Sequence, residues 1–451
     1  MIKGQGNGPK VLSPAFVGGM MDYIEALEYI HGIPRAPERT GLDRVKSLMR
    51  HLGNPQHGMK FIHVAGTNGK GSTSRIISLI LEKSGYRTGL YTSPFIEVFE
   101  ERIQVNSRCI DQESLARLTE KVRDAIADVM AEGYFHPTEF EVVTAIMFLY
   151  FKEMDIDYGV IEVGLGGKND ATNVLEPLIS VITSISFDHI EYLGDTIDSI
   201  AGHKAGIIKN APTVSAPQDP KAAEVLIRRA HATGSDLTFI SGDDIKYVGM
   251  DEWKQLIELT VKPWGTIRSH LSLLGKHQLE NALLAVTAVS RLVSLGGSVP
   301  SDAVVSSLGE VIWPARMELF GRNPVVILDG AHNTHGMRSL IESVDSYFRD
   351  LPRVVILGIL KDKEAYLMAK LASQGAQVVI CTAPPTPRAL TPAELMAYIP
   401  DHVERIAEPS YEKALETAKK ISEPSGIILI TGSLYMMGDF RKVLRQRETE
   451  V

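Results

Sequence analysis

One glycine-rich segment, FIHVAGTNGKGSTS at residues 61–74, combines residue types and spacing that suit the binding of phosphate. Its glycines let backbone N–H groups approach an anion, the N-terminus of a following helix adds partial positive charge, and Lys70 adds a full one. The spacing departs from the strict P-loop pattern, because two residues separate the first two glycines and Gly71 lies between Lys70 and Ser72. The alternative is an ordinary glycine turn. Because the apolar residues of 76–81 supply a helical face directly afterwards, we favour a nucleotide as the ligand.

Two later strand-like runs end in side chains that suit a metal ion. Residues 158–163 lead into VGLGGKNDATN, where Glu162 lies at the strand end and Asp170 in the loop. A carboxylate there is well placed to hold magnesium against nucleotide phosphates. Residues 179–184 lead into SFDHIEYLGDT, which adds a cluster of polar side chains, Asp188, His189 and Glu191. Each loop alone fits an ordinary turn or a structural histidine, but the three strand ends should share one edge of the sheet.

Three basic residues later in the chain could either bind a ligand or simply be solvated surface side chains. The segment IAGHKAGIIK contains Lys204 and Lys209, and on residue type alone these fit two solvated lysines at a helix end. Arg316 follows Pro314, and its planar guanidinium suits bidentate binding of phosphate or carboxylate in a cleft between domains. The alternative for Arg316 is a surface arginine.

The segment ILDGAHN at residues 327–333 has the form of a strand end, a turn and a helix start. Asp329 is a candidate hydrogen-bond acceptor for a ribose, and His332 is a candidate contact for phosphate or substrate. The alternative is an Asx-type turn in which Asn333 caps the following helix. The sequence alone leaves both interpretations open.

The elements that must position these residues alternate along the chain. Strands are expected at residues 61–65, 88–91, 158–163, 179–184 and 213–216, and helices at residues 71–84, 112–131, 138–153 and 219–233. This alternation predicts an α/β fold with a mostly parallel sheet covered on both faces. Residues 254–261 and 267–274 resemble a small antiparallel insert instead, and a long helix is expected at 278–295.

A domain boundary falls best near residues 311–320, VIWPARMELF, where Trp-Pro interrupts a helical pattern. A second α/β series follows, with strands expected at residues 325–328, 353–358, 377–381 and 426–430. We therefore expect a flexible N-terminal extension at residues 1–20, a central domain at 21–312, a linker at 313–319 and a smaller C-terminal domain at 320–451. A doubly wound domain of that size binds ligands at the carboxyl ends of its strands.

The composition is that of an ordinary soluble globular protein, with 44% hydrophobic and 23% charged residues. The formal net charge of −8 argues against a surface that binds nucleic acid. Two cysteines, Cys109 and Cys381, lie far apart, so we expect no structural disulfide and a reducing, cytoplasmic location. No apolar run reaches the length of a membrane span, and the N-terminus lacks the apolar core of a secretion signal. Met21 is an alternative start of the chain.

The order and spacing of the motifs resemble one known family. The segments that carry the resemblance are DYIEALEYIHGI, GTNGKGS, YTSPFIEVFEERIQVN, TEFEVVTA, VIEVGLGGKNDATN, SFDHIEYLGDTIDSIAGHKAGIIK, GKHQLENALLA, WPARME, LDGAHN and TGSLYMMG. Together they resemble the folylpolyglutamate synthase and dihydrofolate synthase family, a branch of the Mur-ligase superfamily of ATP-dependent amide-forming ligases. The resemblance implies a P-loop-containing central domain, a smaller Rossmann-like C-terminal α/β domain, and catalysis in the cleft between them.

By matching motifs, the resemblance assigns roles to individual residues. The residues expected to bind ATP are Asn68, Gly69, Lys70, Gly71, Ser72, Asn281, Arg316 and Asp329. The expected magnesium ligands are Ser93, Glu162, His189 and the carbamate form of Lys204. The positions expected on the pterin or folate side are Thr138, Phe140, Glu141, Lys168, Asn169 and Asp170, and those near glutamate are His332 and Ser433. The residues expected to act in catalysis are Lys70, Lys204 and His189.

The resemblance also implies a set of cofactors. Family members carbamylate the lysine of the KAGI motif with carbon dioxide, and the match places Lys204 there. A neutral amine can add CO2, and the carbamate is an anionic oxygen ligand suited to a second magnesium ion. The expected cofactors are therefore two Mg²⁺ ions and CO2 for carbamylation, with ATP as co-substrate and K⁺ as a further candidate ion.

Three positions depart from the family pattern. Lys168 and Asn169 stand where the family usually has arginine and leucine, so the charge is kept but the bidentate fork is lost. His203 precedes the carbamylated lysine, where glutamate is usual, and is placed to alter carbamate stability or to bind metal itself. TEFE replaces a commoner aromatic pair, which weakens the case for stacking on a pteridine ring.

The predicted reaction uses ATP to activate a carboxylate as an acyl phosphate, which the amine of L-glutamate then attacks. The acceptor is dihydropteroate, the γ-carboxylate of a (tetrahydro)folate, or both. One alternative is a Mur-like ligase that joins a different acid or amino acid, and another is a nucleotide-binding regulator without ligase activity. The expected partners are small molecules only, with neither nucleic acid nor membrane, and the chain is expected to be a monomer.

Overall fold

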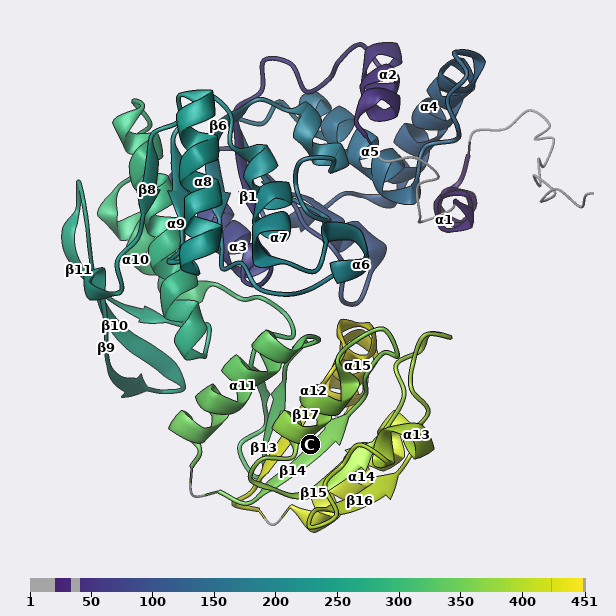
Figure 1. Ribbon diagram of the computed structural model, residues 1–451, viewed down its shortest axis with the longest axis vertical. Helices are drawn as coiled ribbons and strands as arrows, with labels where there is room; N and C mark the ends of the chain where they lie inside the picture. Colours follow the sequence, from purple (N-terminus) through teal and green to yellow (C-terminus); the bar gives the residue numbers. More distant parts are fainter. Residues whose placement is uncertain (1–20, 34–40, 350, 423, 449–451) are drawn as a thin grey trace, which may run out of the picture.

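The computed structural model describes residues 21–33, 41–349, 351–422 and 424–448, so the expected extension at residues 1–20 lies outside the described part. Two β-sheets with helices packed on them form the two halves of the molecule, and the first half lies above the second in Figure 1. The predicted α/β class, with a mostly parallel sheet followed by a smaller α/β unit, is confirmed. No helix among the described residues is long and apolar enough to cross a membrane.

The first sheet has eight strands in the order β4-β3-β2-β5-β1-β6-β7-β8. Its strands are β1 (Phe61–Ala65), β2 (Thr88–Tyr91), β3 (Ile103–Val105), β4 (Arg108–Cys109), β5 (Tyr158–Glu162), β6 (Pro177–Ile182), β7 (Thr213–Ser215) and β8 (Leu237–Phe239). The six strands from β2 to β8 in that order pair in parallel, and β3 and β4 add an antiparallel edge. Every residue of β1 and β5 is buried, which explains why both appear in the sequence as continuous apolar runs.

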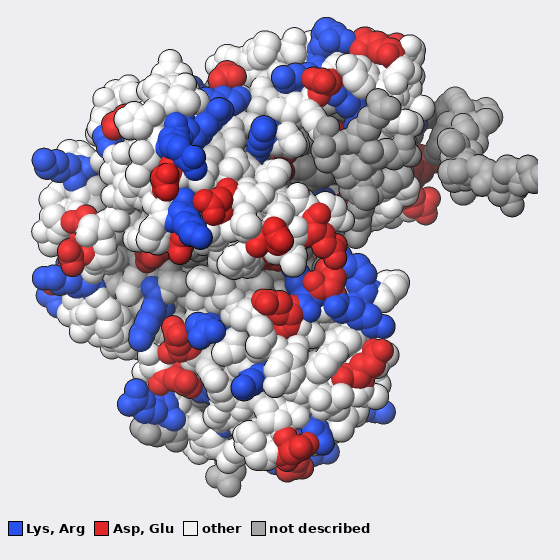
Figure 2. All heavy atoms as spheres, in the orientation of Figure 1, with Lys and Arg blue, Asp and Glu red and all other residues white. Residues whose placement is uncertain are grey.

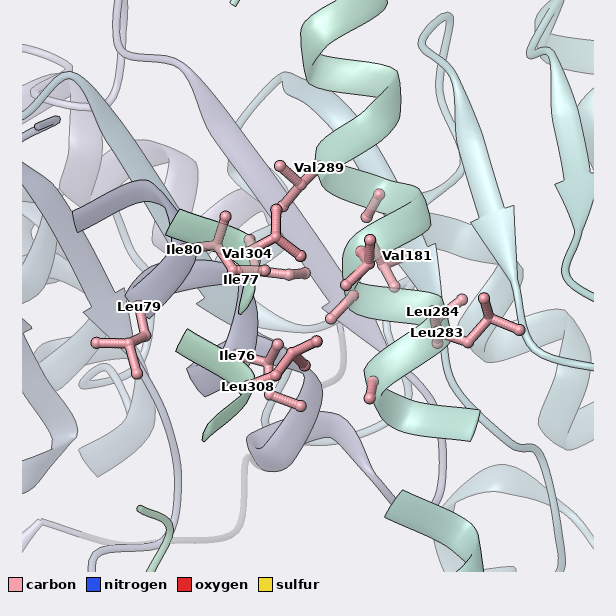
Figure 3. Close-up of a cluster of buried hydrophobic side chains, with 14 of the residues drawn as sticks. Ile76, Ile77, Leu79, Ile80, Val181, Leu283, Leu284, Val289, Val304 and Leu308 are labelled. Carbon is pink, nitrogen blue, oxygen red and sulfur yellow. The ribbon is translucent and has the colours of Figure 1, made fainter. Parts of the chain in front are cut away.

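Helices cover both faces of this sheet. They are α1 (Tyr23–Gly32), α2 (Asp43–His51), α3 (Lys70–Lys83), α4 (Gln112–Ala131), α5 (Glu139–Glu153), α6 (Ile190–Leu193), α7 (Ile197–Lys204), α8 (Pro220–Thr233), α9 (Lys276–Ser294) and α10 (Ser301–Glu310). Side chains of β1 alternate between two cores: Ile62 and Val64 pack with α3, α9 and α10, whereas Phe61 packs with α4 and α5. Figure 3 shows the first core, where Ile77 of α3 lies near Val304 of α10. Packing along α3 therefore holds its N-terminus at the carboxyl edge of the sheet.

A three-stranded antiparallel sheet, in the order β11-β10-β9, extends the first half. Its strands are β9 (Ile245–Asp251), β10 (Lys254–Val261) and β11 (Gly265–Leu271). The antiparallel insert expected from the sequence is present, and β9 is a third strand beyond the two expected ones. Figure 1 shows the β9–β10 hairpin reaching down towards α11 (Thr334–Tyr347) of the second half.

The second half is built on a six-stranded sheet in the order β12-β13-β17-β14-β15-β16, parallel except for β12. Its strands are β12 (Glu318–Phe320), β13 (Val325–Leu328), β14 (Arg353–Leu357), β15 (Ala376–Cys381), β16 (Glu404–Ala407) and β17 (Ile427–Thr431). Its further helices are α12 (Ala365–Ala372), α13 (Pro392–Met396), α14 (Tyr411–Ile421) and α15 (Met437–Glu448). Alternate strand residues pack on α11, α12 and α13 on one face and on α14 and α15 on the other.

The expected central elements agree with the observed ones to within one to three residues at their ends. One of the shifts bears on the site: the sequence predicts a strand at residues 179–184, whereas β6 is Pro177–Ile182, so Thr183 and Ser184 already belong to the loop above the sheet edge. The short strands at the sheet edges, namely β4, β8, β12 and β16, and β3 next to β4, are absent from the prediction. Edge strands carry few residues and are half solvated, so their apolar signal is weak.

Candidate active site

A cleft of about 500 Å³ lies where the two halves face each other. The first half lines it with the loops after β1, β5 and β6 and with the start of α9, and the second half lines it with the loop after β13 and the start of α11. β1, β5 and β6 are neighbouring parallel strands, so their carboxyl ends lie at one edge. The convergence of strand ends expected from the sequence is therefore present.

The glycine loop after β1 has the backbone shape that an anion-binding turn needs. Gly69 precedes α3 with φ of 86°, in the left-handed region, and a Cβ at this position would collide with the side chain of Asn281. The ammonium of Lys70 donates to the carbonyl of Thr67 at 3.1 Å, which folds the side chain over the loop. Ser72 accepts a hydrogen bond from Gln278 Nε2 at 3.3 Å. The helix N-terminus, the glycines and Lys70 thus present positive charge to the cleft.

Asn281 and Gln278 are buried on the first turns of α9, directly beside this loop. Asn281 Nδ2 donates to Gln278 Oε1 at 2.9 Å, so the two amides form one hydrogen-bonded pair. Gln278 is not among the residues that the sequence led us to expect in the site. Its place in GKHQLENALLA, three residues before Asn281 on a helix, was the available signal.

The candidate metal ligands of the first half also line the cleft. Glu162 ends β5, is 5% exposed, and accepts a hydrogen bond from the backbone N–H of Ser93 at 3.2 Å. Burial raises the pKa of Glu162, and the positive charge of Lys70 opposes that shift. His189 stands before α6 with φ of 51°, and its side chain is exposed. The oxygen donors of Glu162 and Ser93 suit magnesium or manganese, whereas an imidazole nitrogen is a less usual ligand for either ion.

Among the described residues no group of three or more His, Cys, Asp or Glu side chains is arranged to hold a metal ion. Glu162 and Ser93 are adjacent. His189 and Lys204 also line the cleft, but the four side chains do not surround a common metal position. Mg²⁺ usually keeps several waters and binds through one or two carboxylates plus substrate phosphates. The donor set therefore fits an ion that arrives with a nucleotide, rather than a closed protein cage.

Lys204 is the most perturbed basic residue of the cleft. It ends α7, is 3% exposed, and donates to the carbonyl of Gly66 at 2.7 Å. Burial together with the nearby charge of Lys70 lowers its pKa to about 7, and Asp188 opposes the shift. A substantial fraction of neutral amine is therefore present near neutral pH.

On the second half, Asp329 and Arg316 face the cleft from the loop after β13 and from the linker. Asp329 accepts hydrogen bonds from the backbone N–H groups of Met317 and Ala331, at 2.9 and 2.8 Å. Burial raises its pKa, and the charge of Arg316 opposes the shift. Each carboxylate oxygen of Asp329 has one of these donors and keeps a second lone pair for a ligand.

Asp188 is the hub of contacts between the two halves. Its carboxylate accepts from Lys363 Nζ at 2.7 Å and from Asn333 Nδ2 at 2.9 Å, both in the second half. His332 Nε2 lies 3.9 Å away. Burial raises the pKa of Asp188, but the surrounding cations outweigh burial and hold that pKa well below its usual range. Asn68 of the phosphate loop also accepts from Asn333 Nδ2, at 3.0 Å.

Sequence reasoning assigned no role to Lys363, and none to Asn333 beyond a helix cap. The cap is real, because Asn333 Oδ1 accepts from Gly336 N at 2.8 Å, and the amide nitrogen still reaches across the cleft. Lys363 follows β14 in the segment GILKDK, so it too lies beyond a strand carboxyl end. That position was the signal that could have identified it.

The six residues expected on the pterin or folate side do not line this cleft. Thr138 and Glu141 cap the N-terminus of α5, and Glu141 forms a buried ion pair with Arg44 at 2.8 Å. The ring of Phe140 lies 5.9 Å from that of Tyr91. These side chains are engaged in holding α5 against the first sheet.

The remaining members of that set belong to the loop after β5. Asp170 is buried, and its carboxylate accepts from the backbone N–H groups of Leu165 and Thr172, which shapes the glycine turn. Lys168 and Asn169 are exposed, and the backbone N–H of Lys168 donates to the carbonyl of His203 at 2.7 Å. The loop thus packs on the end of α7.

The two residues expected near glutamate differ in placement. His332 lines the cleft, and its Nδ1 lies 2.9 Å from the carbonyl of Gly330. Ser433 does not line it: the residue is 1% exposed, and its hydroxyl accepts from Tyr435 N at 3.3 Å, so it caps a short 3₁₀ turn. Leu434, the next residue, reaches the cleft instead.

Comparisons with known proteins agree with this architecture. The Mur ligase middle domain matches residues 64–289, and the Mur ligase glutamate ligase domain matches residues 315–434. A folylpolyglutamate synthase of Lacticaseibacillus casei is 37% identical over 429 residues, which cover 94% of this chain and 99% of that protein. A dihydrofolate synthase/folylpolyglutamate synthase of Bacillus subtilis (strain 168) is 37% identical over 439 residues, with the same coverage of 94% and 99%.

The solved structure of Mycobacterium tuberculosis folylpolyglutamate synthase complexed with ADP superimposes with a TM-score of 0.86 at 29% identity. The match covers 94% of this chain and 99% of that one. The two sheets and the cleft between them are thus those of an ATP-dependent ligase of the Mur type. Within that class, the chain belongs to the folylpolyglutamate synthase/dihydrofolate synthase family.

Proposed function

We propose that this ligase adds L-glutamate to dihydropteroate, to the γ-carboxylate of a (tetrahydro)folate, or to both, through an acyl phosphate made from ATP. The observation that carries the proposal is the composition of the cleft. Lys70, Glu162 and Lys204 of the first half face Arg316 and Asp329 of the second across one cleft of about 500 Å³. The names of the relatives at 37% identity supply the substrates.

The nucleotide is placed with its phosphates on the loop before α3 and its ribose towards Asp329. Support for this placement comes from the left-handed Gly69, from Lys70 and from the remaining lone pairs of Asp329. Asn281 and Arg316 complete the set of nucleotide contacts. Ser93, Glu162 and His189 would hold magnesium together with the nucleotide, and the ion would neutralise charge on the transferring phosphoryl group.

Lys204 is proposed as the site of carbamylation by CO2, which converts a cation into an anionic ligand for a second magnesium ion. Its lowered pKa, about 7, supports the proposal because only the neutral amine adds CO2. In its unmodified form the ammonium contacts the carbonyl of Gly66 at 2.7 Å, so the modified group would stand beside the phosphate loop. A role for K⁺ is a secondary proposal.

Positioning and charge neutralisation account for most of the catalysis. The substrate carboxylate attacks the γ-phosphate in line and ADP leaves, which gives the acyl phosphate, while Lys70 stabilises the charge on the phosphoryl oxygens. The amine of L-glutamate then attacks the acyl carbon and phosphate leaves. Contact between the halves, through Asp188 with Lys363 and Asn333, excludes water from the acyl phosphate. His332 lies at the same junction and is the candidate contact for the incoming glutamate.

The residues expected on the acceptor side lie outside the lining of the cleft. Lys168 and Asn169 are exposed, and Thr138, Phe140, Glu141 and Asp170 are engaged within the first half. A Mur-like ligase with a different acid or amino acid is therefore kept as the second candidate. We propose a cytoplasmic monomer that acts on small molecules, with the domain boundaries given above.

The deciding experiment measures ADP release by the purified protein with Mg²⁺, ATP and L-glutamate, comparing 7,8-dihydropteroate with tetrahydrofolate as acceptor. Turnover with both acceptors identifies a bifunctional enzyme, and turnover with one identifies the branch. Reactions that lack glutamate or the acceptor measure background ATP hydrolysis. ATP binding without turnover on either acceptor would reject the folate assignment and favour the second candidate.

A further inference from the structure

The loop that carries Ser93 is organised by one carboxylate. Glu101 accepts hydrogen bonds from three successive backbone N–H groups, those of Ile96, Glu97 and Val98, at 2.7, 3.1 and 3.3 Å. The loop, residues 92–101, has no strand partner of its own before the short 3₁₀ turn that ends it. Its inner end is held at the site by hydrogen bonds from Thr92 N to the carbonyl of Arg102 and from Ser93 N to Glu162, at 3.1 and 3.2 Å. Residues 96–98 therefore depend for the rest on what packs against their outer side.

Helix α15 of the second half packs directly on that outer side. A Cβ on Gly438 would collide with the carbonyl of Ile96, so the helix backbone lies against the loop backbone. Arg441, one turn later and 5% exposed, forms an ion pair with Glu97. Arg445 reaches the other oxygen of Glu97 at 3.1 Å from the helix surface.

The same guanidinium holds the linker. Arg441 Nε and Nη2 donate to the carboxylate of Glu318 at 2.9 and 2.8 Å, and Glu318 accepts in turn from Ala315 N at 2.9 Å. Ala315 and Met317, on either side of Arg316, have φ of 54° and 44°, conformations that non-glycine residues seldom adopt. Such a backbone persists only where surrounding contacts hold it.

The loop and the linker meet at the site. Ser93, Glu162, Arg316 and Leu434 together line a cavity of about 70 Å³ that adjoins the main cleft. Burial lowers the pKa of Arg441 to about 10, so without carboxylate partners its buried charge would destabilise the folded state. Glu97 and Glu318 supply them, one from the loop and one from the linker side.

We infer that Arg441 is a positioning residue: it ties the Ser93 loop and the Arg316 linker to α15, so that metal ligand and nucleotide contact are aligned together when the two halves dock. The inference rests on the proposed function for the roles of Ser93 and Arg316, but the tie itself does not. Arg441 acts through its two carboxylate partners, Glu97 and Glu318, rather than on a substrate.

The test is hydrogen exchange over residues 95–99 and 313–317 in the protein without ligands. Arg441→Met should speed exchange in both segments by about tenfold, because both lose a tie to a packed helix. Glu97→Gln should speed exchange only in the first segment, and Glu318→Gln only in the second. These two variants keep the test decisive if Arg441→Met fails to fold.

A matched control is Arg353→Met, since Arg353 is also buried in the second half but pairs with Asp345, away from the loop. It should leave exchange in both segments unchanged, and Arg405→Met, a half-buried arginine on β16, serves if Arg353→Met unfolds. Equal exchange in the Arg441 and control variants would overturn the inference.

Kinetics separate positioning from simple loss of folded protein. Arg441→Met should raise the Mg²⁺ concentration for half-maximal ADP release by about tenfold and lower kcat, whereas partial unfolding lowers kcat alone. An unchanged Mg²⁺ requirement with reduced kcat would reject the positioning role. Faster exchange in a protein whose wild type forms no ADP would uphold the tie and reject the proposed function instead.

Discussion

At the scale of single residues, the site depends on a few cations whose surroundings set their chemistry. Lys70 and Lys204 are both lysines of the same cleft, yet Lys204 is nearly fully buried, with a pKa lowered to about 7. Lys70 is half-exposed on the phosphate loop and donates to the carbonyl of Thr67. Their roles differ accordingly: Lys70 faces the phosphate site from the loop, and Lys204 can be neutral and react.

Lys70→Ala should abolish ADP formation, because the charge that faces the transferring phosphoryl group is lost. The fold should remain, since the side chain is half-exposed and its hydrogen bond is to a neighbouring loop carbonyl. Circular dichroism and the thermal midpoint check the fold, and ADP release checks the reaction. Near-normal turnover in this variant would remove the phosphate-loop assignment.

Lys204→Ala should lose activity and regain part of it when short carboxylates such as acetate or formate are added. The added anion would occupy the space left by the side chain and replace the proposed carbamate oxygens. Lys209→Ala is the matched control, because Lys209 lies in the same segment but donates to carbonyls of Asn173 and Leu175, outside the cleft. Full activity of Lys204→Ala without added carboxylate would rule out a catalytic carbamate.

At the scale of elements, the important unit is β1, the glycine loop and α3. The strand is held by parallel neighbours on both sides, and the helix by α9 and α10, so the loop between them has little freedom. The backbone of Gly69 adopts the left-handed conformation there, and the absence of a Cβ leaves room for the side chain of Asn281. The left-handed backbone conformation of Gly69 is therefore what makes this strand–loop–helix unit suitable for binding phosphate.

Gly69→Ala should weaken ATP binding by at least about tenfold, or about 1.4 kcal/mol, because the new Cβ collides with Asn281 and moves the loop. Gly58→Ala is the matched control: Gly58 has φ of 82°, close to the 86° of Gly69, but beyond its two chain neighbours no residue has an atom within 4 Å of its Cβ position. Both variants should lose about 1–2 kcal/mol of stability from the left-handed backbone. Isothermal titration with ATP separates them, and equal affinities would contradict the loop assignment.

At the scale of the whole molecule, contacts among the described residues join the two halves at several places. They include the hub at Asp188, the tie at Arg441, and the β9–β10 hairpin against the end of α11. Trp253 at the hairpin tip stacks on Phe348 with ring centroids 5.4 Å apart, and Tyr347 donates to Gln255 at 2.7 Å. Acidic and basic side chains are interspersed over the face shown in Figure 2, so no area of one sign dominates it.

Trp253→Ala should loosen the contact between the halves and split thermal unfolding into two calorimetric transitions, because the aromatic pair is lost while each sheet keeps its own core. Trp264→Ala is the control: Trp264 belongs to the same insert, but its indole donates to Val299 within the first half. That variant should lower the temperature of the unfolding transition without splitting it into two. A single unchanged transition in Trp253→Ala would show that the hairpin does not join the halves.

Much of this protein follows from properties of contiguous residues. The glycine loop, the alternation of strands and helices, and the candidate residues at strand ends depend on backbone freedom and hydrophobic period, which a short stretch of sequence expresses. Lys70 and Glu162 are identifiable from such local patterns, whereas the roles expected for His189 and Lys204 came from the family resemblance; all four line the cleft. The motif match also predicts Ser433 there, but its hydroxyl is turned to a local cap.

Other features depended on how two sheets pack, which no local pattern encodes. Lys363 meets Asp188 across 175 residues of sequence, and Arg441 joins a loop and a linker that lie far apart in the chain. Such contacts arise only when burial of both cores brings the carboxyl ends of the strands together. The sequence by itself determined the fold class and the phosphate loop, because both are local. The tertiary structure decided which side chains share the cleft and which arginine aligns them, because these are consequences of packing.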